Sequence, residues 1–430
     1  MEDSRRSVPR TDTVLDDPRL DQALEQLSRG AVKAAVAAAL ERCRAGALEP
    51  SAVVPAVLES LPPSAAGLRA VINATGVIVH TNLGRAPLSK AAQEAVLTAA
   101  GSTDVEFDLE TGLRDRRGRG ALAALARAVP DAEDVLVVNN GAAALSLVAS
   151  ALAGRREIVV ARGELVEIGD SFRIPDVLVA SGAVLREVGT TNRVHLADYA
   201  EAVTDATALV LKVHPSNFVV RGFTASVPVE ELAGLPVPVV VDIGSGLLNP
   251  HPKLPREPDA TSTLRAGAAL VTASADKLLG GPQAGLVLGR SDLVQRLRRH
   301  PLARALRVDK LRLAALEATL SGPTPPVVAA LQADPEVLLF RATSICREVA
   351  DVVAAEPLRT SAVVGGGGAP DVALPSAAVA LPAALAHRLR TGSPAVVGHV
   401  NDGRLILDLI AVDAARDAML ASCVRRAAGI

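Results

Sequence analysis

The chain has 430 residues, of which 49% are hydrophobic and 1% aromatic, and its formal net charge is −2. This length allows two or three domains with a substantial buried core, and the composition is typical of a globular protein and not of a disordered one. A net charge so close to zero argues against broad, nonspecific binding of nucleic acid.

Neither a membrane anchor nor a disulfide framework is indicated. No apolar run reaches the roughly 18 residues that span a bilayer, and the segment Met1–Ser7 is too polar for a signal peptide. We therefore expect a cytoplasmic protein without a membrane partner. Three cysteines, Cys43, Cys346 and Cys423, are odd in number and far apart, so that we expect neither disulfides nor a metal site.

The first segment of the chain is predicted to be a small helical domain. Apolar residues recur at helical spacing from Asp21 to Cys43, and Gly46 follows as a stop signal. The segment Leu61–Ser64, with two adjacent prolines, is typical of a linker. We predict a helical N-terminal domain over residues 1–65.

Between residues 66 and 310 the pattern changes to short β-branched runs separated by helical segments. Runs of consecutive apolar residues suit strands that are covered on both faces, so we predict an α/β domain with a mainly parallel sheet. The predicted strands are Val135–Val138, Glu157–Ala161, Ala208–Lys212, Pro238–Asp242, Ala269–Thr272 and Gly285–Gly289.

The last segment, residues 311–430, is predicted to be a smaller α+β domain. Helices are expected near 334–352 and 413–427, and strands near 395–409. Four consecutive glycines, Gly365–Gly368, resemble a phosphate-binding loop. No strand-to-helix context surrounds them, so we interpret them as a flexible loop.

Lys277 and Asp242 carry the strongest chemical signal. A lysine that forms a Schiff base with pyridoxal phosphate, together with an upstream aspartate that keeps the pyridinium nitrogen protonated, is the minimum protein chemistry of an electron-sink enzyme. The chain has only six lysines, and arginine cannot replace one because it does not lose its proton near neutral pH. Ser274 and Lys277 also match the Ser-x-x-Lys signature of acyl-enzymes, but the Lys-Thr-Gly triplet of that class is missing.

A second group of residues is predicted to hold the cofactor phosphate. Ligands of open α/β sheets bind at the carboxyl ends of strands, and both Asp242 and the segment Asn140-Gly141-Ala142 follow apolar runs. The segment precedes a helix, so its backbone N–H groups would face an anion, with the helix dipole behind them. An ordinary strand-to-helix turn is the alternative. Ser274 would add a hydroxyl group to the same phosphate.

The chain resembles bacterial L-seryl-tRNA(Sec) selenium transferases, also called selenocysteine synthases. The segment Asp276–Gly285, with the sequence DKLLGGPQAG, is one of several long motifs that run in family order over most of the chain. The others are Val71–Leu88, Phe107–Gly112, Arg162–Gly169, Phe172–Asp176, Glu187–Asn192, Lys212–Asn217 and His300–Lys310.

This resemblance implies a fold-type-I enzyme that uses pyridoxal phosphate, with Lys277 bound to the cofactor. It also implies a homo-oligomer, arranged as a ring of dimers, with active sites at dimer interfaces. Arg85, Arg304 and Arg307 would hold the anionic phosphate of the selenium donor, selenophosphate. Planar guanidinium groups suit a tetrahedral oxyanion, which is an independent reason to expect arginine there.

The reaction implied by the resemblance converts seryl-tRNA(Sec) to selenocysteinyl-tRNA(Sec) by loss of the seryl hydroxyl and addition of selenium. One departure concerns the RNA: the N-terminal segment has slightly more acidic than basic side chains, and aromatic residues that stack on bases are almost absent. Two alternatives share part of the pattern. One is a related lyase that acts on a small amino acid or amino sugar acid, and the other is a noncatalytic tRNA-binding homologue. The full N-terminal length and the spacing of Arg304 and Arg307 favour the transferase.

Overall fold

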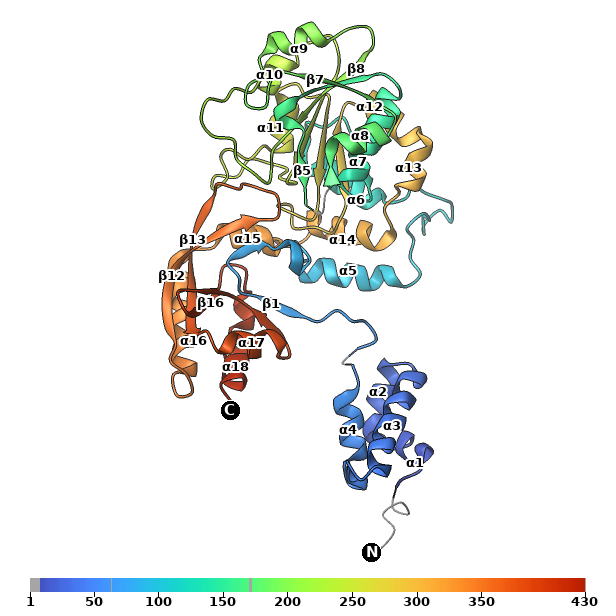
Figure 1. Cartoon of the computed structure of the whole chain (residues 1–430). Coiled ribbons are helices and arrows are strands. Elements are labelled where there is room, and N and C mark those ends of the chain that lie inside the picture. The colour runs from blue at the N-terminus through green and yellow to red at the C-terminus, as the bar shows by residue number, and fades with distance from the viewer. Residues whose placement is uncertain (1–7, 63, 170–171, 430) are drawn as a thin grey trace, which may run out of the picture. The chain divides into compact units, whose positions relative to one another are not determined.

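A computed structural model describes residues 8–62, 64–169 and 172–429. The chain divides into two compact units, Met1–Ala70 and Val71–Ile430 (Figure 1). Within the described ranges, no helix combines the length and the apolar character that crossing a bilayer requires.

The first unit is a helical bundle. Its longest helix, α3, follows α2 directly, so the helix predicted over residues 21–43 is interrupted. The break occurs because Ser28 caps a new helix, with its hydroxyl accepting a hydrogen bond from the N–H of Ala31 at 3.2 Å. Apolar side chains of all these helices form one core. The predicted linker includes residue 63, which lies outside the described residues. The helices are α1 (Thr11–Leu15), α2 (Asp21–Gln26), α3 (Arg29–Arg44) and α4 (Val53–Ser60), with short 3₁₀ turns at Pro18–Leu20 and Pro50–Ala52.

The second unit contains a seven-stranded sheet with the order β3-β11-β10-β9-β8-β4-β7. Only β11 runs antiparallel to its neighbours, which confirms the mainly parallel α/β sheet. All six predicted strands are present, and β7 at the edge was not predicted. The strands are β3 (Asp134–Val138), β4 (Glu157–Ala161), β7 (Val184–Val188), β8 (Thr207–Val213), β9 (Val239–Gly244), β10 (Leu270–Ser274) and β11 (Gly285–Gly289).

Helices cover both faces of this sheet, which explains why its central strands are apolar at consecutive positions. Two separate apolar cores lie on the two faces. One face packs against α6 (Arg119–Ala128), α9 (Leu196–Ala202), α10 (Val229–Leu232), α11 (Ala260–Arg265) and α14 (Lys310–Ser321). The other packs against α7 (Gly141–Val148), which continues as the π-helix Ala149–Ala153, and against α8 (Ile174–Ala180) and α12 (Ser291–Arg299).

A five-stranded sheet, with the order β15-β16-β13-β12-β2, occupies the C-terminal region. Its two longest strands, β12 and β13, were not predicted. The expected helices are present as α16 and α18, and they pack on this sheet in a third core. The elements are β12 (Glu356–Gly365), β13 (Ala373–Pro382), β14 (Ala395–Val397), β15 (His399–Asn401), β16 (Arg404–Asp408), α15 (Pro326–Gln332), α16 (Pro335–Val349), α17 (Leu385–Thr391) and α18 (Asp417–Ala428).

Strands from the start of the second unit complete the C-terminal sheets. The strand β1 (Val71–Asn73) pairs with β14, and β2 (Val77–Val79) pairs with β12, both in parallel. The division of this unit into domains at residues 66–310 and 311–430 stays a prediction. The remaining elements are α5 (Lys90–Ala100), α13 (Pro301–Ala305), β5 (Glu167–Ile168) and β6 (Phe172–Arg173).

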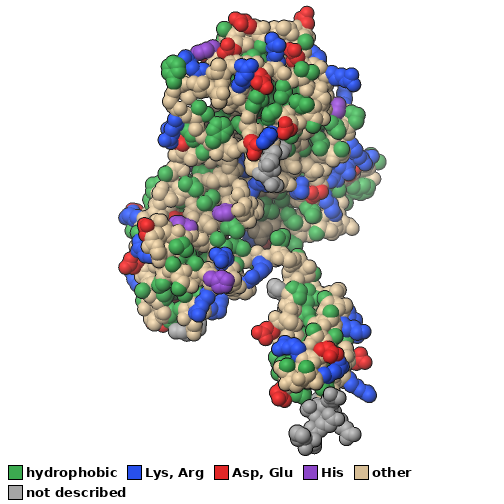
Figure 2. Space-filling view, in the orientation of Figure 1, with side chains coloured by type: hydrophobic (Ala, Val, Ile, Leu, Met, Phe, Trp, Pro, Cys, Tyr) green, Lys and Arg blue, Asp and Glu red, His purple; other side chains and the backbone are tan. Residues whose placement is uncertain are grey.

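Acidic and basic side chains are interspersed on the face of the molecule shown in Figure 2. Many arginines of the chain pair with a carboxylate, as Arg265 does with Asp131 at 2.9 Å and Arg359 does with Glu336 at 2.6 Å. This mixture agrees with the near-neutral net charge.

Candidate active site

The carboxyl ends of β3, β9 and β10 bring the predicted cofactor residues together. Asp242 lies in β9, Ser274 ends β10, and Asn140 follows β3. The antiparallel strand β11 lies between β3 and β10, and it begins at Gly285 beside Asn140. The sheet therefore places residues that are more than one hundred positions apart in the sequence together at the carboxyl ends of its strands.

Lys277 follows β10 in a turn whose backbone is tied to neighbouring loops. The N–H of Leu278 donates to the carbonyl of Ser245 at 2.9 Å, and the N–H of Gly280 donates to the carbonyl of Lys277 at 3.0 Å. Burial of the Lys277 amine lowers its pKa below the usual lysine value, and the positive charge of Arg85 acts in the same direction. The charges of Asp242 and Asp276 oppose this shift. A lysine with a lowered pKa has more of the unprotonated form that attacks an aldehyde.

Asp242 is almost completely buried, with an exposed fraction of 7%. Burial raises the pKa of its carboxyl group, whereas a hydrogen bond from the Thr272 hydroxyl at 2.8 Å and the charge of Lys277 lower it. A positive charge placed beside this carboxylate would lower the pKa further and offset the cost of burial. The protonated ring nitrogen of pyridoxal phosphate is such a charge.

The segment Asn140-Gly141-Ala142 forms the N-terminus of α7. The side chain of Asn140 caps the helix by accepting a hydrogen bond from the N–H of Ala143 at 2.8 Å. A Cβ atom on Gly141 would lie 2.6 Å from the Ser274 hydroxyl oxygen. Only glycine therefore lets Ser274 approach this helix end, where a hydroxyl group and free N–H groups suit a phosphate. These features fit the phosphate group of the cofactor.

Arg85 lies beside this site in an unusual backbone conformation. Its φ angle is 64°, which places a side chain other than glycine in the left-handed region. Its guanidinium group contacts the carboxylate of Asp276 at 3.3 Å, directly before Lys277. Arg85 and Asp276 line a groove of about 450 Å³ that also contains Arg312. Arg312 donates a hydrogen bond to the Asn139 side chain at 2.9 Å and so connects the groove with the residue that precedes the segment Asn140-Gly141-Ala142.

The other two predicted donor-binding arginines do not line this groove. Arg304 belongs to α13, and Arg307 lies beside the end of β3, where it bridges Val138. The guanidinium group of Arg307 contacts the carboxylate of Glu106 at 3.5 Å. Arg304 and Arg307 thus lie close together in one segment and Arg85 in another, and the common role of the three in holding the donor stays a prediction.

Several polar residues near Lys277 were not singled out in the sequence. Asp276, Ser216 and His214 lie within motifs that resemble the family, so those motifs held a signal for them. Glu257 had no such signal, because it follows an irregular proline-containing segment. Its carboxylate lies 3.4 Å from the His214 ring, and its charge acts on the pKa of Lys277.

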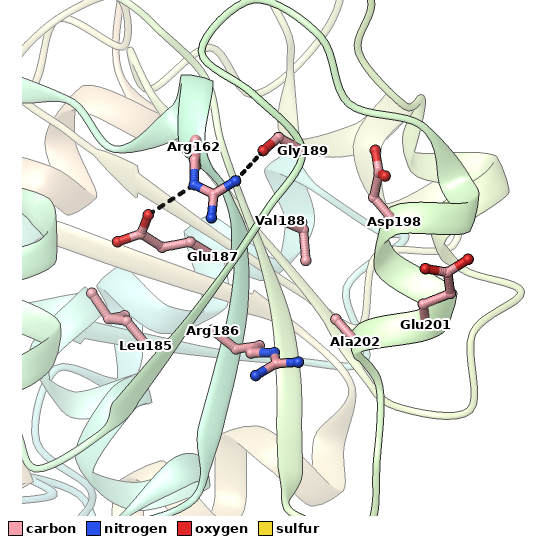
Figure 3. A pocket seen from close by; sticks show the side chains of 9 residues that line it. All are labelled: Arg162, Leu185, Arg186, Glu187, Val188, Gly189, Asp198, Glu201 and Ala202. Carbon is pink, nitrogen blue, oxygen red and sulfur yellow. Dashed lines mark hydrogen bonds and ion pairs between the residues drawn. The ribbon is translucent and has the colours of Figure 1, made fainter.

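A separate hollow lies at the sheet edge, between β7 and α9 (Figure 3). Its Arg162 points toward Glu187, with an ion pair at 3.2 Å, and toward the carbonyl of Gly189. Asp198 and Glu201 project from α9 on the opposite wall. None of the predicted cofactor residues lines this hollow, and we do not assign the chemistry to it. Within the described ranges, no group of three or more His, Cys, Asp or Glu side chains is arranged to hold a metal ion.

Comparisons with known proteins agree over nearly the whole chain. Residues 71–413 match the family model described as L-seryl-tRNA selenium transferase, and residues 5–44 match the one described as selenocysteine synthase N terminal. The L-seryl-tRNA(Sec) selenium transferase of Geobacter sulfurreducens is 44% identical over 93% of this chain and 94% of its own length. That of Moorella thermoacetica is 47% identical over 80% of this chain and 78% of its own length. Among solved structures, a D-glucosaminate-6-phosphate ammonia-lyase has a similar fold, with a TM-score of 0.59 and 19% identity over 84% of this chain and 96% of its own.

Proposed function

Because this chain belongs to the L-seryl-tRNA selenium transferase family, we propose that it converts seryl-tRNA(Sec) to selenocysteinyl-tRNA(Sec) with selenium from selenophosphate. The cofactor is pyridoxal phosphate, as the fold and the family indicate. The observation that carries the proposal is the convergence of Lys277, buried Asp242 and the α7 N-terminus at one sheet edge. A cytoplasmic location is part of the proposal.

Four groups of the chain would hold the cofactor. The Lys277 amine would bind its aldehyde carbon, Asp242 would pair with the ring nitrogen, and Ser274 and the N–H groups of Gly141 and Ala142 would hold its phosphate. Bound pyridoxal phosphate supplies an electron sink for the electron pair that remains when the α-proton of the seryl group is removed. Negative charge on Asp242 keeps the ring nitrogen positive, which strengthens that sink.

Lys277 has a second task as a base. When the Lys277 amine is not bound to the cofactor it would be placed to accept the α-proton of the seryl group, and its lowered pKa increases the share of the unprotonated form that can do so. The net change at the seryl Cβ breaks one C–O bond and forms one C–Se bond. The hydroxyl group leaves with a proton as water. A water molecule then cleaves the Se–P bond of the donor, so that selenium stays on Cβ as a selenol and the phosphoryl group leaves as phosphate.

Arg85 is the best placed of the predicted donor-binding residues. Its guanidinium group borders the groove beside Lys277 and is 43% exposed, so an anion can reach it. Asp276 holds the guanidinium in place through their contact. We assign the phosphate of selenophosphate to this groove, with Arg304 and Arg307 as further predicted contacts.

The partners of the chain are seryl-tRNA(Sec), selenophosphate and further copies of itself. The match of residues 5–44 to a selenocysteine synthase N-terminal model supports tRNA contact by the helical unit. Large apolar side chains at Phe107, Leu109 and Leu113 are exposed, which supports self-association into dimers. Sedimentation of the purified protein would test this oligomeric state.

The decisive experiment supplies the purified protein with seryl-tRNA(Sec) and selenophosphate. Free serine and a noncognate seryl-tRNA serve as controls, and Lys277→Ala serves as the inactive variant. We expect selenocysteinyl-tRNA(Sec) only from the cognate substrate, and we expect Lys277→Ala to bind the RNA without converting it. Turnover of free serine alone would instead indicate a lyase for small amino acids. Absence of cofactor absorbance would indicate a noncatalytic homologue.

A further inference from the structure

The four glycines Gly365–Gly368 form the beginning of the loop between β12 and β13, and the structure gives this loop a defined place. Three of them have φ angles of 73°, 55° and 76°. A Cβ atom on Gly365 would lie 2.3 Å from a methyl group of Val77, and one on Gly366 would lie 2.3 Å from a methyl group of Val79. Glycine is therefore required for both the backbone conformation and the close approach to β2. The loop predicted to be flexible is instead packed against its surroundings.

The third glycine lies against the Lys277 amine, and the fourth lies against the neighbouring Leu278. A Cβ atom on Gly367 would lie 3.3 Å from the Lys277 amine nitrogen and 3.6 Å from the Ser216 hydroxyl oxygen. One on Gly368 would lie 3.3 Å from the side chain of Leu278. Backbone from the C-terminal sheet thus covers an amine that belongs to the seven-stranded sheet.

One buried carboxylate ties this loop to the segment before α11. Glu257 accepts a hydrogen bond from the N–H of Ala369, directly after the glycines, at 2.7 Å. The same oxygen lies 3.4 Å from the His214 ring nitrogen, and the Glu257 side chain is 1% exposed. The end of the loop is held as well, because Asp371 contacts Arg221 at 3.2 Å and Arg256 at 3.9 Å.

We propose that Gly365–Gly368 form a wall over the Lys277 amine, here called the glycine wall, and that Glu257 is the positioning residue that holds it there. This inference rests on the proposed function, because it assigns a role toward the same cofactor-binding lysine. Glycine backbone fits the role because any side chain at residue 367 would enter the space of the amine. Glu257 fits it because a buried carboxylate accepting a backbone N–H fixes the chain more firmly than a neutral acceptor does.

The first test compares Gly367→Ala with Gly403→Ala. Gly403 has a similar φ angle, 71°, but a Cβ atom there would meet nothing within 4 Å. Both variants bear the same kind of backbone strain, and only the first pushes against Lys277. The readouts are cofactor affinity by titration of the cofactor-free protein, and borohydride trapping followed by mass mapping of the modified lysine.

We expect Gly367→Ala to lower cofactor affinity by roughly tenfold or more relative to Gly403→Ala, because overpacking at the amine costs binding. Thermal unfolding of both variants controls for their folding. Equal cofactor affinity in the two variants would overturn the proposal.

The second test examines Glu257 with a charged-to-neutral series. Glu257→Gln keeps an oxygen that can accept from Ala369, whereas Glu257→Ala removes it. We expect affinity and trapping at Lys277 to fall most in the alanine variant and to recover in part in the glutamine variant, whose neutral oxygen accepts a weaker hydrogen bond. Asp408→Ala is the matched control, because Asp408, in β16 of the other sheet, is also buried and accepts hydrogen bonds from the Ser376 hydroxyl and the Ile410 N–H.

A Glu257→Ala variant that traps the cofactor as well as Asp408→Ala does would refute the role of Glu257. Both tests measure cofactor binding and not conversion of RNA. A wild-type protein that traps the cofactor at Lys277 but does not convert seryl-tRNA(Sec) would therefore refute the proposed function and leave this inference standing.

Discussion

Arg85 offers a test that separates backbone strain from donor binding. At a φ angle of 64° a residue with a Cβ atom is destabilised by about 1–2 kcal/mol relative to its usual conformation. Glycine has no such strain, although the greater conformational entropy of its unfolded state lowers the stability of the folded state by about 0.5–1 kcal/mol. We therefore expect Arg85→Gly to be more stable than Arg85→Ala by about 1 kcal/mol, since both variants lose the same ion pair.

The ion pair itself contributes little to stability. Arg85 is 43% exposed and contacts Asp276 at 3.3 Å, so its loss costs about 0–1 kcal/mol. Relief of strain then offsets much of this cost in Arg85→Gly. Urea denaturation of the wild type and both variants measures the three free energies of unfolding.

Unlike stability, donor binding should not differ between Arg85→Gly and Arg85→Ala. Both variants lack a charge-assisted contact worth about 1.5–3 kcal/mol, so we expect KM for selenophosphate to rise roughly ten- to a hundredfold in each. Asp402, with a φ angle of 49° in the turn between β15 and β16, is the control, because its glycine and alanine variants should differ in stability without a change in KM. An unchanged KM in Arg85→Gly would refute donor binding by Arg85, and equal stability of the glycine and alanine variants would refute the strain.

Three further predictions concern the same region. Gly141→Ala should lower cofactor affinity, measured by titration, because its Cβ atom would lie 2.6 Å from the Ser274 hydroxyl oxygen and displace it. Cofactor affinity equal to that of the wild type would contradict the phosphate site. Burial raises the pKa of Asp242, so the folded protein binds the proton of this carboxyl group more tightly than the unfolded chain does. The stability contributed by the protonated carboxyl group is therefore fully present below the pKa of the unfolded chain and is lost as the pH rises through the pKa of the folded protein. Urea denaturation of cofactor-free Asp242→Asn should therefore show less loss of stability over that rise than the wild type, and an identical pH dependence would argue against a raised pKa. Lys212→Met should cost about 3–5 kcal/mol in free energy of unfolding, because buried Glu164, which Lys212 contacts at 3.0 Å, would lose its cation and keep only the hydrogen bond from the Val213 N–H. A loss below about 1 kcal/mol would show that this hydrogen bond is enough to hold the buried charge.

Local patterns in the sequence predicted much of the site. The strands β3, β9 and β10 were visible as apolar runs because both of their faces are buried, and the residues at their carboxyl ends were the expected cofactor ligands. Lys277 could be singled out because a lysine can lose its proton and attack an aldehyde, whereas the chain's many arginines cannot. Their placement around one edge agrees with that prediction, while their catalytic roles still await the experiments above.

The C-terminal sheet was harder to predict from local patterns. Its long strands β12 and β13 include prolines and polar residues and are covered unevenly, so their alternation does not resemble that of a buried strand. The pairing of β1 and β2 with strands about three hundred residues later has no local signal in the sequence.

The amino-acid sequence alone predicted Lys277 and Asp242 as cofactor residues and located the strands that carry them, because side-chain reactivity and hydrophobic period are properties of short segments. Only the tertiary structure decided that Gly367 lies against the Lys277 amine, that Glu257 holds the following residue, and that Arg312 and not Arg304 lines the groove with Arg85. These contacts join segments distant in sequence, and their geometry depends on how two sheets pack together, which no local pattern records.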